Sequence, residues 1–221
     1  MQPGRFYVGI ILPVGRLTSD RLWGLADIAE RFGSGTLRLT VWQNLIVSDI
    51  AESELPAARA AIAELGLGTE GSTVRGGLVA CTGNAGCKFA LSDTKRHALE
   101  LADYLEARLA LDTPLNIHLT GCPNSCAQHY VGDIGLLATK VEKSKDEEVE
   151  GYHVVVGGGS GAESRLGREI WRDIPADVMP ARVAAMLRGY LGHRRSAESF
   201  HDFVNRHGVA ELLRLFAAAA A

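Results

Sequence analysis

The sequence has little of what marks membrane, secreted or nucleic-acid-binding chains. Its first residues, MQPGRFYVGIILPVGR, hold an apolar run far short of the roughly 20 residues that cross a bilayer, and they lack the cleavage-site pattern of a signal peptide. The net charge of −3, with no basic stripe interleaved with aromatics, argues against nucleic acid as a partner. We therefore expect a cytoplasmic protein with no membrane and no nucleic-acid partner.

What is present is typical of an ordinary soluble globular protein, with 47% hydrophobic and 22% charged residues. A chain of 221 residues can form one large domain or two small ones. The pattern of apolar residues predicts two, over residues 1–68 and 69–221.

The first domain alternates strands and helices. Its predicted elements are a strand at 6–14, a helix at 18–32, a strand region at 36–47 and a helix at 53–65 closed by Gly66. This β-α-β-α unit resembles half of a ferredoxin-like fold.

The second domain opens with a strand that leads directly into a cysteine, and the overall fold class is α+β. Its polar segment at 140–151 reads as a solvated hairpin tip between two strands. In chain order, we expect strands at 76–80, 115–121, 133–141 and 152–159, with a helix at 88–110 after the first strand and helices at 180–191, 197–207 and over the last dozen residues.

The few cysteines all fall near strand ends. Cys81 and Cys87 form a C-x5-C pair, and Cys122 and Cys126 form a C-x3-C pair. An iron–sulfur cluster needs four thiolates and close backbone N–H groups, and nearby glycines allow that approach. A zinc site fits the second spacing but not the first, and four buried free thiols are a third interpretation. Four clustered cysteines in a reducing compartment favour ligands over disulfides. The neighbouring glycines and proline are Gly83, Gly86, Gly121 and Pro123.

The residues around the cysteines carry a more specific signal. The runs ACTGNAGCKFA and HLTGCPNSCAQHYVGDIGL resemble the cluster signature of the siroheme nitrite and sulfite reductases. The run GRLTSDRLWGLADIAERFGSGTLRLTVWQNLIV resembles the small repeat that precedes the cluster domain in that family, and HVVVGGGSG and ESFHDFVNRHG resemble later parts of it. The resemblance covers nearly the whole chain, and its central motif is highly specific.

The resemblance implies a fold and two coupled cofactors. A ferredoxin-like small repeat precedes an α/β nitrite/sulfite reductase cluster-binding domain. In this family four cysteines bind a 4Fe–4S cluster, and the last of the C-x3-C pair also binds the siroheme iron. By this resemblance Cys81, Cys87 and Cys122 bind the cluster alone, and Cys126 is also the axial ligand of siroheme. A shared thiolate gives a short path for electrons to an iron whose other face is open to substrate.

The resemblance also implies an activity of assimilatory type, the six-electron reduction of nitrite to ammonia, with electrons from a donor such as ferredoxin. GCPNSCAQ and DIGL are more similar to the nitrite branch than to the sulfite branch. The loop CTGNAGC departs from the commoner nitrite-branch form, which has a bulky residue before its second cysteine. Sulfite therefore stays as the alternative substrate.

The chain resembles the second half of a family member about twice as long. In the first half, an arginine in a motif like RLTxRQ is directed at the bound anion, whereas the run RLTVWQ has Trp42 there. A site for a small oxyanion gathers several Arg and Lys side chains, and the family draws these largely from the first half. We nominate no substrate-binding residue here. A separate N-terminal half is one candidate partner, and the sequence leaves open whether the other half comes from a separate chain, from a second copy or not at all.

Five further residues are candidates for contact with siroheme. By resemblance, Gln43 and Asn44 match a pair near the siroheme edge, although a polar pair at a strand end also satisfies local backbone groups. Thr120 precedes the second cysteine pair and Asn124 lies within it, near the bridging cysteine, and both are candidates for hydrogen bonds to sulfur or to a siroheme carboxylate. Arg16 is a candidate partner for a siroheme carboxylate, or an exposed turn residue.

Two other functions compete with reduction. Precorrin-3B synthase, which acts on a tetrapyrrole, has a similar cluster motif, but its second cysteine pair more often lacks the Pro-Asn found at Pro123 and Asn124. The third interpretation is an iron–sulfur electron-transfer module with no catalysis of its own.

Overall fold

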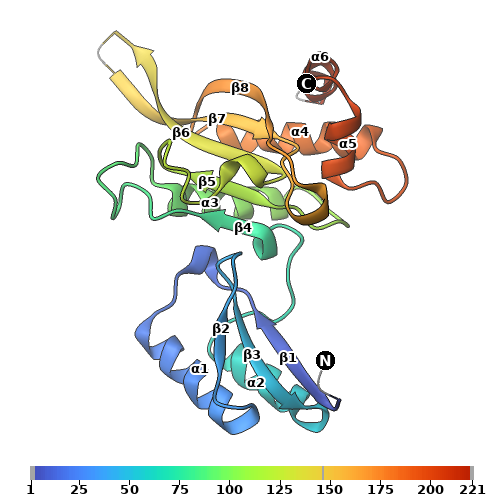
Figure 1. The fold of residues 1–221 in the computed structure, drawn as a ribbon. Helices are drawn as coiled ribbons and strands as arrows, with labels where there is room; N and C mark the ends of the chain where they lie inside the picture. Colours follow the sequence, from blue (N-terminus) through green and yellow to red (C-terminus); the bar gives the residue numbers. More distant parts are fainter. Residues whose placement is uncertain (1–2, 146, 220–221) are drawn as a thin grey trace. The chain divides into compact units, whose positions relative to one another are not determined.

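The computed structural model describes residues 3–145 and 147–219, which form two compact units (Figure 1). The first unit ends at Gly76 and the second begins at Gly77. Residues 69–76 follow the boundary expected from the sequence, but they contact the first unit more than the second and so belong to the first. Val74 is buried there, and the Asn44 side chain donates a hydrogen bond to the Gly76 carbonyl (3.0 Å).

The first unit is a three-stranded antiparallel sheet with two helices on one face (Figure 1). The strand order is β1-β3-β2. Helix α1 begins after Thr18, whose side chain accepts the Arg21 N–H (3.3 Å) and so caps the helix. The elements are β1 (Arg5–Ile10), α1 (Ser19–Phe32), β2 (Leu37–Leu39), β3 (Leu45–Ala51) and α2 (Leu55–Glu64).

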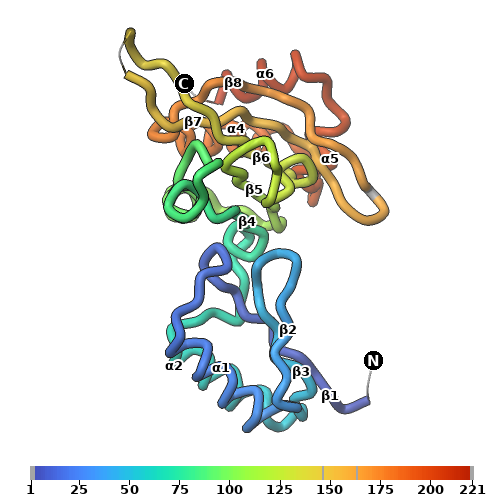
Figure 2. Tube along the Cα trace, turned by 60° about the vertical axis from the view of Figure 1, so that its left-hand side comes forward, coloured from blue at the N-terminus to red at the C-terminus, as the bar shows by residue number. Residues whose placement is uncertain are grey.

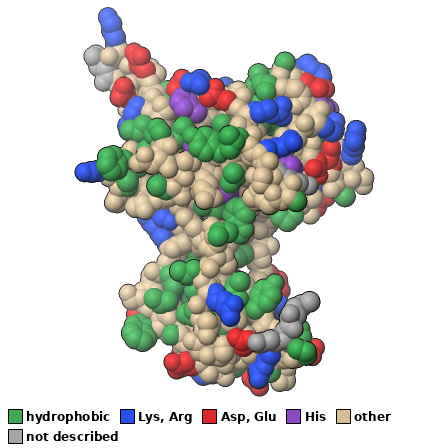
Figure 3. Space-filling model, in the orientation of Figure 1, with side chains coloured by type: hydrophobic (Ala, Val, Ile, Leu, Met, Phe, Trp, Pro, Cys, Tyr) green, Lys and Arg blue, Asp and Glu red, His purple; other side chains and the backbone are tan. Residues whose placement is uncertain are grey.

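The core of this unit lies between the sheet and the helices. Helix α1 buries Leu25 and Ile28 at helical spacing, and the sheet buries Val8 and Val47 against them. Trp23 on the opposite face of α1 is 76% exposed, and apolar side chains are visible on the surface in the space-filling view (Figure 3). The burial pattern is that of amphipathic elements packed on one side only.

The strand region expected at 36–47 is a hairpin of two strands, so the unit is β-α-β-β-α. The Thr40 N–H donates to the Asn44 carbonyl (2.9 Å) and closes the turn. Gln43 takes a left-handed conformation there (φ 59°), which reverses the chain. The first strand likewise ends at Ile10, short of the expected residue 14, and a 3-10 turn follows at Pro13–Gly15, within which Val14 has φ 47°.

The second unit is built on a five-stranded mixed sheet in the order β4-β5-β6-β7-β8. Strands β4, β5 and β6 are parallel, and β6, β7 and β8 are antiparallel. The elements are β4 (Leu78–Ala80), α3 (Thr94–Glu106), β5 (Ile117–Thr120), β6 (Ile134–Ser144), β7 (Glu147–Val156), β8 (Arg168–Pro175), α4 (Met179–His193), α5 (Phe200–Arg206) and α6 (Val209–Ala218).

Three sequence predictions for this unit need correction. The helix expected at 88–110 begins only at Thr94, because Asp93 caps it and the preceding residues form turns. Strand β8 was not predicted, because its charged residues are typical of the surface. The strand lies at the edge of the sheet, where charged side chains are common. Most of the polar segment at 140–151 is strand rather than tip, because β6 and β7 pair as far out as Ser144 and Glu147. Residue 146 of that segment lies outside the described residues.

The helices of the second unit pack on the sheet and on one another. The tube view shows α4 beside the five-stranded sheet (Figure 2). Tyr190 of α4 meets Phe200 and Phe203 edge-on, with ring centroids 5.4 Å apart in both cases. Helix α4 also contacts α3 and α6. Among the described residues, no helix is both long and apolar enough to cross a membrane.

Candidate iron–sulfur site

The two cysteine pairs begin at the carboxyl ends of neighbouring parallel strands. Cys81 directly follows β4, and Cys122 follows β5 after Gly121. The Cys81 N–H donates to the Leu119 carbonyl (3.0 Å), which extends the β4–β5 ladder by one bond. The carboxyl edge of a parallel sheet is where such folds place their ligands. This edge therefore brings the first residue of each pair together.

The loop from Cys81 to Cys87 is a tight turn that depends on glycine. The Cys87 N–H donates to the Gly83 carbonyl (2.9 Å), and so does the Gly86 N–H (3.2 Å). Gly83 has φ +71°, and a Cβ there would lie 2.8 Å from the Thr94 nitrogen. Both the backbone conformation and the close approach therefore require glycine at this position.

The sulfur of Cys81 is surrounded by hydrogen-bonding groups. The Gly121 N–H points at Cys81 Sγ (3.1 Å), and Thr94 Oγ1 lies 3.5 Å from the same sulfur. Thr94 also donates to the Cys81 carbonyl (2.9 Å). The Gly121 N–H is the kind of donor that stabilises a thiolate and tunes an iron–sulfur cluster, whereas the single hydroxyl hydrogen of Thr94 goes to the Cys81 carbonyl. Sequence reasoning missed Thr94, because it lies 13 residues away at the start of α3 and carries no motif.

The loop from Cys122 to Cys126 is held from beneath by two buried histidines. His118 Nδ1 lies 2.9 Å from the Ala127 carbonyl and 3.1 Å from that of Gln128, to which it donates as the protonated nitrogen. His129 Nδ1 lies 3.0 Å from Ser125 Oγ. Burial, with His118 nearby, lowers the pKa of His129 to about 4, so it is neutral at pH 7. His129 thus holds Ser125 within the loop, and His118 holds the two residues that follow Cys126.

The four sulfurs differ in exposure. Cys122 is buried, Cys81 and Cys87 are half-buried, and Cys126 is exposed. Among the described residues, no three His, Cys, Asp or Glu side chains are gathered tightly enough to hold a single metal ion. A 4Fe–4S cluster bonds each cysteine to a different iron and so takes ligands that are spread more widely. The glycine-lined loops and the sulfur-directed N–H fit such a cluster.

Thr120 and Asn124 lie on either side of Cys122. Thr120 Oγ1 is buried and has no hydrogen-bond partner among the residues that the structure describes. A buried hydroxyl without a partner is costly, so a group bound beside it would gain from its hydrogen bond. Asn124 is exposed at the tip of the loop. Both residues are thus beside the cysteines, as the sequence suggested.

The three candidates in the first unit have different surroundings. Asn44 uses both ends of its amide on backbone: Oδ1 accepts the Leu12 N–H (3.1 Å), and Nδ2 donates to the Gly76 carbonyl. This is the local, structural role that the sequence left open for it. Arg16 is exposed, and Gln43 lies against Gly15, where a Cβ would be 3.0 Å from the Gln43 Cβ. Gln43 therefore packs against the residue that precedes Arg16.

The family follows from these motifs and from comparison with known proteins. Residues 1–65 match the nitrite/sulfite reductase ferredoxin-like half domain, and residues 70–220 match the nitrite and sulphite reductase 4Fe-4S domain. The chain therefore belongs to the nitrite/sulfite reductase family, a family of oxidoreductases.

Individual relatives come from both branches of that family. The chain is 41% identical to ferredoxin–nitrite reductase of Synechococcus elongatus over 84% of its own length and 36% of the relative's. It is 34% identical to sulfite reductase (ferredoxin) 2 of Mycolicibacterium paratuberculosis over 90% of its own length and 37% of the relative's. The chain thus spans about a third of the length of the curated relatives it matches.

Solved structures agree on the fold. The NirA protein of Mycobacterium tuberculosis superposes with a TM-score of 0.86 at 32% identity, over 93% of this chain and 39% of that one. Dissimilatory sulfite reductase I superposes with a TM-score of 0.80 at 14% identity, over 96% of this chain and 69% of that one. At that identity the second match speaks for the fold alone.

Proposed function

We propose that this chain is the cluster-binding half of an assimilatory siroheme nitrite reductase, with Cys81, Cys87, Cys122 and Cys126 as the ligands of a 4Fe–4S cluster. The observation that carries the proposal is the meeting of Cys81 and Gly121 at the ends of β4 and β5, where an N–H already points at the sulfur. The family match over residues 70–220 supports it.

Cys126 is the ligand proposed to be shared between the cluster and siroheme. Its exposure supports this role, because a bridging sulfur must be open on the side away from the cluster. The buried Thr120 hydroxyl and the exposed Asn124 amide, on either side of Cys122, are the proposed hydrogen-bond partners of siroheme in this unit. Siroheme, once bound, would supply an iron that binds and reduces a small oxyanion.

The relatives support a substrate and a donor. Ferredoxin–nitrite reductases of Synechococcus elongatus, maize, birch and spinach are among the first of them, which supports nitrite as substrate and ferredoxin as donor. The similarity to a sulfite reductase keeps sulfite as the alternative. Trp42 is half-buried at the turn where, by the resemblance, the first half of a family member has an arginine. The cationic groups around the anion are therefore proposed to come from an N-terminal half.

Anaerobic purification tests the cofactors directly. We expect about four irons and four sulfides per chain, and a chlorin-like absorption band if this unit binds siroheme without its partner half. Cys126→Ser should disturb the cluster and the siroheme together, whereas Cys81→Ser should act first on the cluster. Siroheme bound with an unchanged spectrum in Cys126→Ser would rule out the shared ligand. Zinc in place of iron would refute the proposal.

A further inference from the structure

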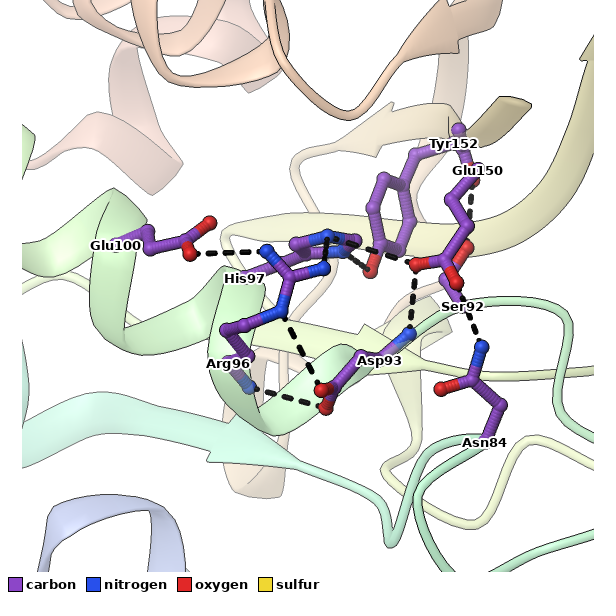
Figure 4. Close-up of polar contacts among 9 residues, drawn as sticks. Asn84, Ser92, Asp93, Arg96, His97, Glu100, Glu150 and Tyr152 are labelled. Carbon is purple, nitrogen blue, oxygen red and sulfur yellow. Dashed lines mark hydrogen bonds and ion pairs between the residues drawn. The ribbon is translucent and has the colours of Figure 1, made fainter.

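Strand β7 carries a run of residues that holds the segment between Cys81 and helix α3 (Figure 4). Glu150 Oε1 accepts a hydrogen bond from the Asn84 side chain (2.6 Å), and Oε2 accepts the Asp93 N–H (3.0 Å). The next residue, Gly151, accepts a bond from Ser92 Oγ (3.4 Å). A strand that is distant in the sequence therefore ties down both ends of this segment.

The proton positions around Glu150 follow from its neighbours. Arg96 Nη2 lies 2.9 Å from His97 Nε2, and a guanidinium can only donate, so Nε2 is the accepting nitrogen. His97 Nδ1 then carries the proton and donates to the Tyr152 oxygen (2.8 Å). Burial, followed by the charge of Arg96, lowers the pKa of His97. A neutral histidine thus packs beside the Glu150 carboxylate, whose Oε2 lies 3.5 Å from Nε2.

Glu150 is an ionised acceptor in this arrangement. Partial burial alone would raise its pKa, but the hydrogen bonds from the Asp93 N–H and the Asn84 amide hold the pKa below its ordinary value. Bonds to a carboxylate are about twice as strong as those between neutral groups. The loop that they hold has little packing of its own, since Asn84, Ala85 and Gly86 are all exposed.

Asn84 occupies the middle of the loop, three residues from Cys81 and three from Cys87. Its own N–H donates to the Ser92 carbonyl (3.1 Å), so the bond to Glu150 closes a small ring that includes the start of α3. Thr94, which contacts Cys81 Sγ, is the residue directly after Asp93. Displacement of Asp93 would therefore also displace a group beside the sulfur.

We propose that Glu150 is a positioning residue for the iron–sulfur site: it holds the Cys81–Cys87 loop against the start of α3 and so sets the stability and reduction potential of the cluster. The inference rests on the cluster assigned under the proposed function. The physical reason is that hydrogen bonds to the sulfurs and nearby charge are what tune such clusters.

The test compares Glu150→Gln and Glu150→Ala with Glu148→Gln in the full chain. Glu148 is the matched control, because it lies two residues away on the same strand, is exposed, and loses the same charge. Gln keeps one acceptor oxygen and loses the charge, whereas Ala loses both bonds. In the metal-free chain, we expect amide hydrogen exchange over residues 82–93 to become about tenfold faster in Glu150→Ala, which corresponds to about 1.4 kcal/mol. Exchange should become less than tenfold faster in Glu150→Gln and should be unchanged in the Glu148→Gln control.

The cluster-loaded chain gives two further readouts. Iron loss to a chelator should speed up in the same order, and the cluster in Glu150→Gln should have a higher midpoint potential, because removal of a negative charge favours the added electron. Asn84→Ala, which alters only the exposed loop, should speed exchange and iron loss in the same direction. This variant keeps the test valid if Glu150→Ala does not fold.

Three results separate the inference from the function on which it rests. If the Glu150 and Asn84 variants match the Glu148→Gln control in exchange rate, iron loss and reduction potential, the role of Glu150 is overturned and the proposed function still stands. Faster exchange with unchanged iron loss and potential would also overturn it, since the loop would then not affect the cluster. A wild-type chain that takes up no iron would overturn the proposed function itself.

Discussion

Gly121→Ala is the sharpest test of the packing around the cysteine loops. A Cβ at this position would lie 2.6 Å from the Cβ of Ala90 and 3.3 Å from Cys81 Sγ. Carbon atoms in contact are about 3.5–4.0 Å apart, so the two loops would have to separate by about 1 Å. The φ of Gly121 lies outside the left-handed region, so backbone strain does not add to the steric effect.

The expected cost of this change follows from overpacking. Insertion of a methyl group into a packed site costs about 1–3 kcal/mol, and the reduced freedom of the unfolded chain returns about 0.4–1 kcal/mol. We therefore expect a net loss of about 1–2 kcal/mol, seen as a fall of about 2–8 °C in the melting temperature of the metal-free chain. The cluster-loaded chain should also lose iron faster, because the Gly121 N–H contacts Cys81 Sγ (3.1 Å).

Two companion variants make the reasoning refutable. Ala90→Gly removes the atom that the new methyl group meets, so the double variant should recover most of the lost stability. Gly192→Ala adds the same methyl group in helix α4, where nothing lies within 4 Å, and should leave stability unchanged or raised by up to about 1 kcal/mol. A melting temperature of Gly121→Ala equal to that of the wild type, or no recovery in the double variant, would show that the loops are not packed as described.

Three other perturbations test the two units. Burial raises the pKa of Asp133 to about 6, so between pH 4 and 6 the folded chain retains a proton that the unfolded chain releases. The free energy of unfolding should therefore fall by at most about 3 kcal/mol as pH rises from about 4 to 6. The urea midpoint of Asp133→Asn should lack this fall, and pH profiles that run parallel for wild type and variant would contradict the prediction. Asn44→Ala should cost about 1–3 kcal/mol in urea unfolding of the first unit, because two backbone groups lose their partner. Phe203 is fully buried against Tyr190, so Phe203→Ala should lower the free energy of urea unfolding of the second unit by about 3–5 kcal/mol. Tyr7→Ala, at a 70% exposed position in the first unit, should cost little.

Long periodic elements were predictable because their signal is local. The helix at residues 18–32 was expected from apolar spacing, and α1 occupies Ser19–Phe32. The hairpin turn at Thr40–Asn44 was not, since residues 40–44 contain no glycine or proline to mark a turn between β2 and β3. The polar strand β8 was missed for the opposite reason: its residues read as surface, and a sheet edge makes them strand.

The sequence by itself determined which residues are candidates for the cluster, because the type and spacing of the cysteines and their flanking glycines can be read along the chain at Cys81, Cys87, Cys122 and Cys126. Only the tertiary structure decided which groups surround them. Thr94 and Glu150 lie 13 and 69 residues beyond Cys81 and carry no motif, yet folding places the first beside its sulfur and the second on its loop. Hydrogen bonds act over about 3 Å in space, so their partners are set by the sheet register and the helix start rather than by distance along the sequence.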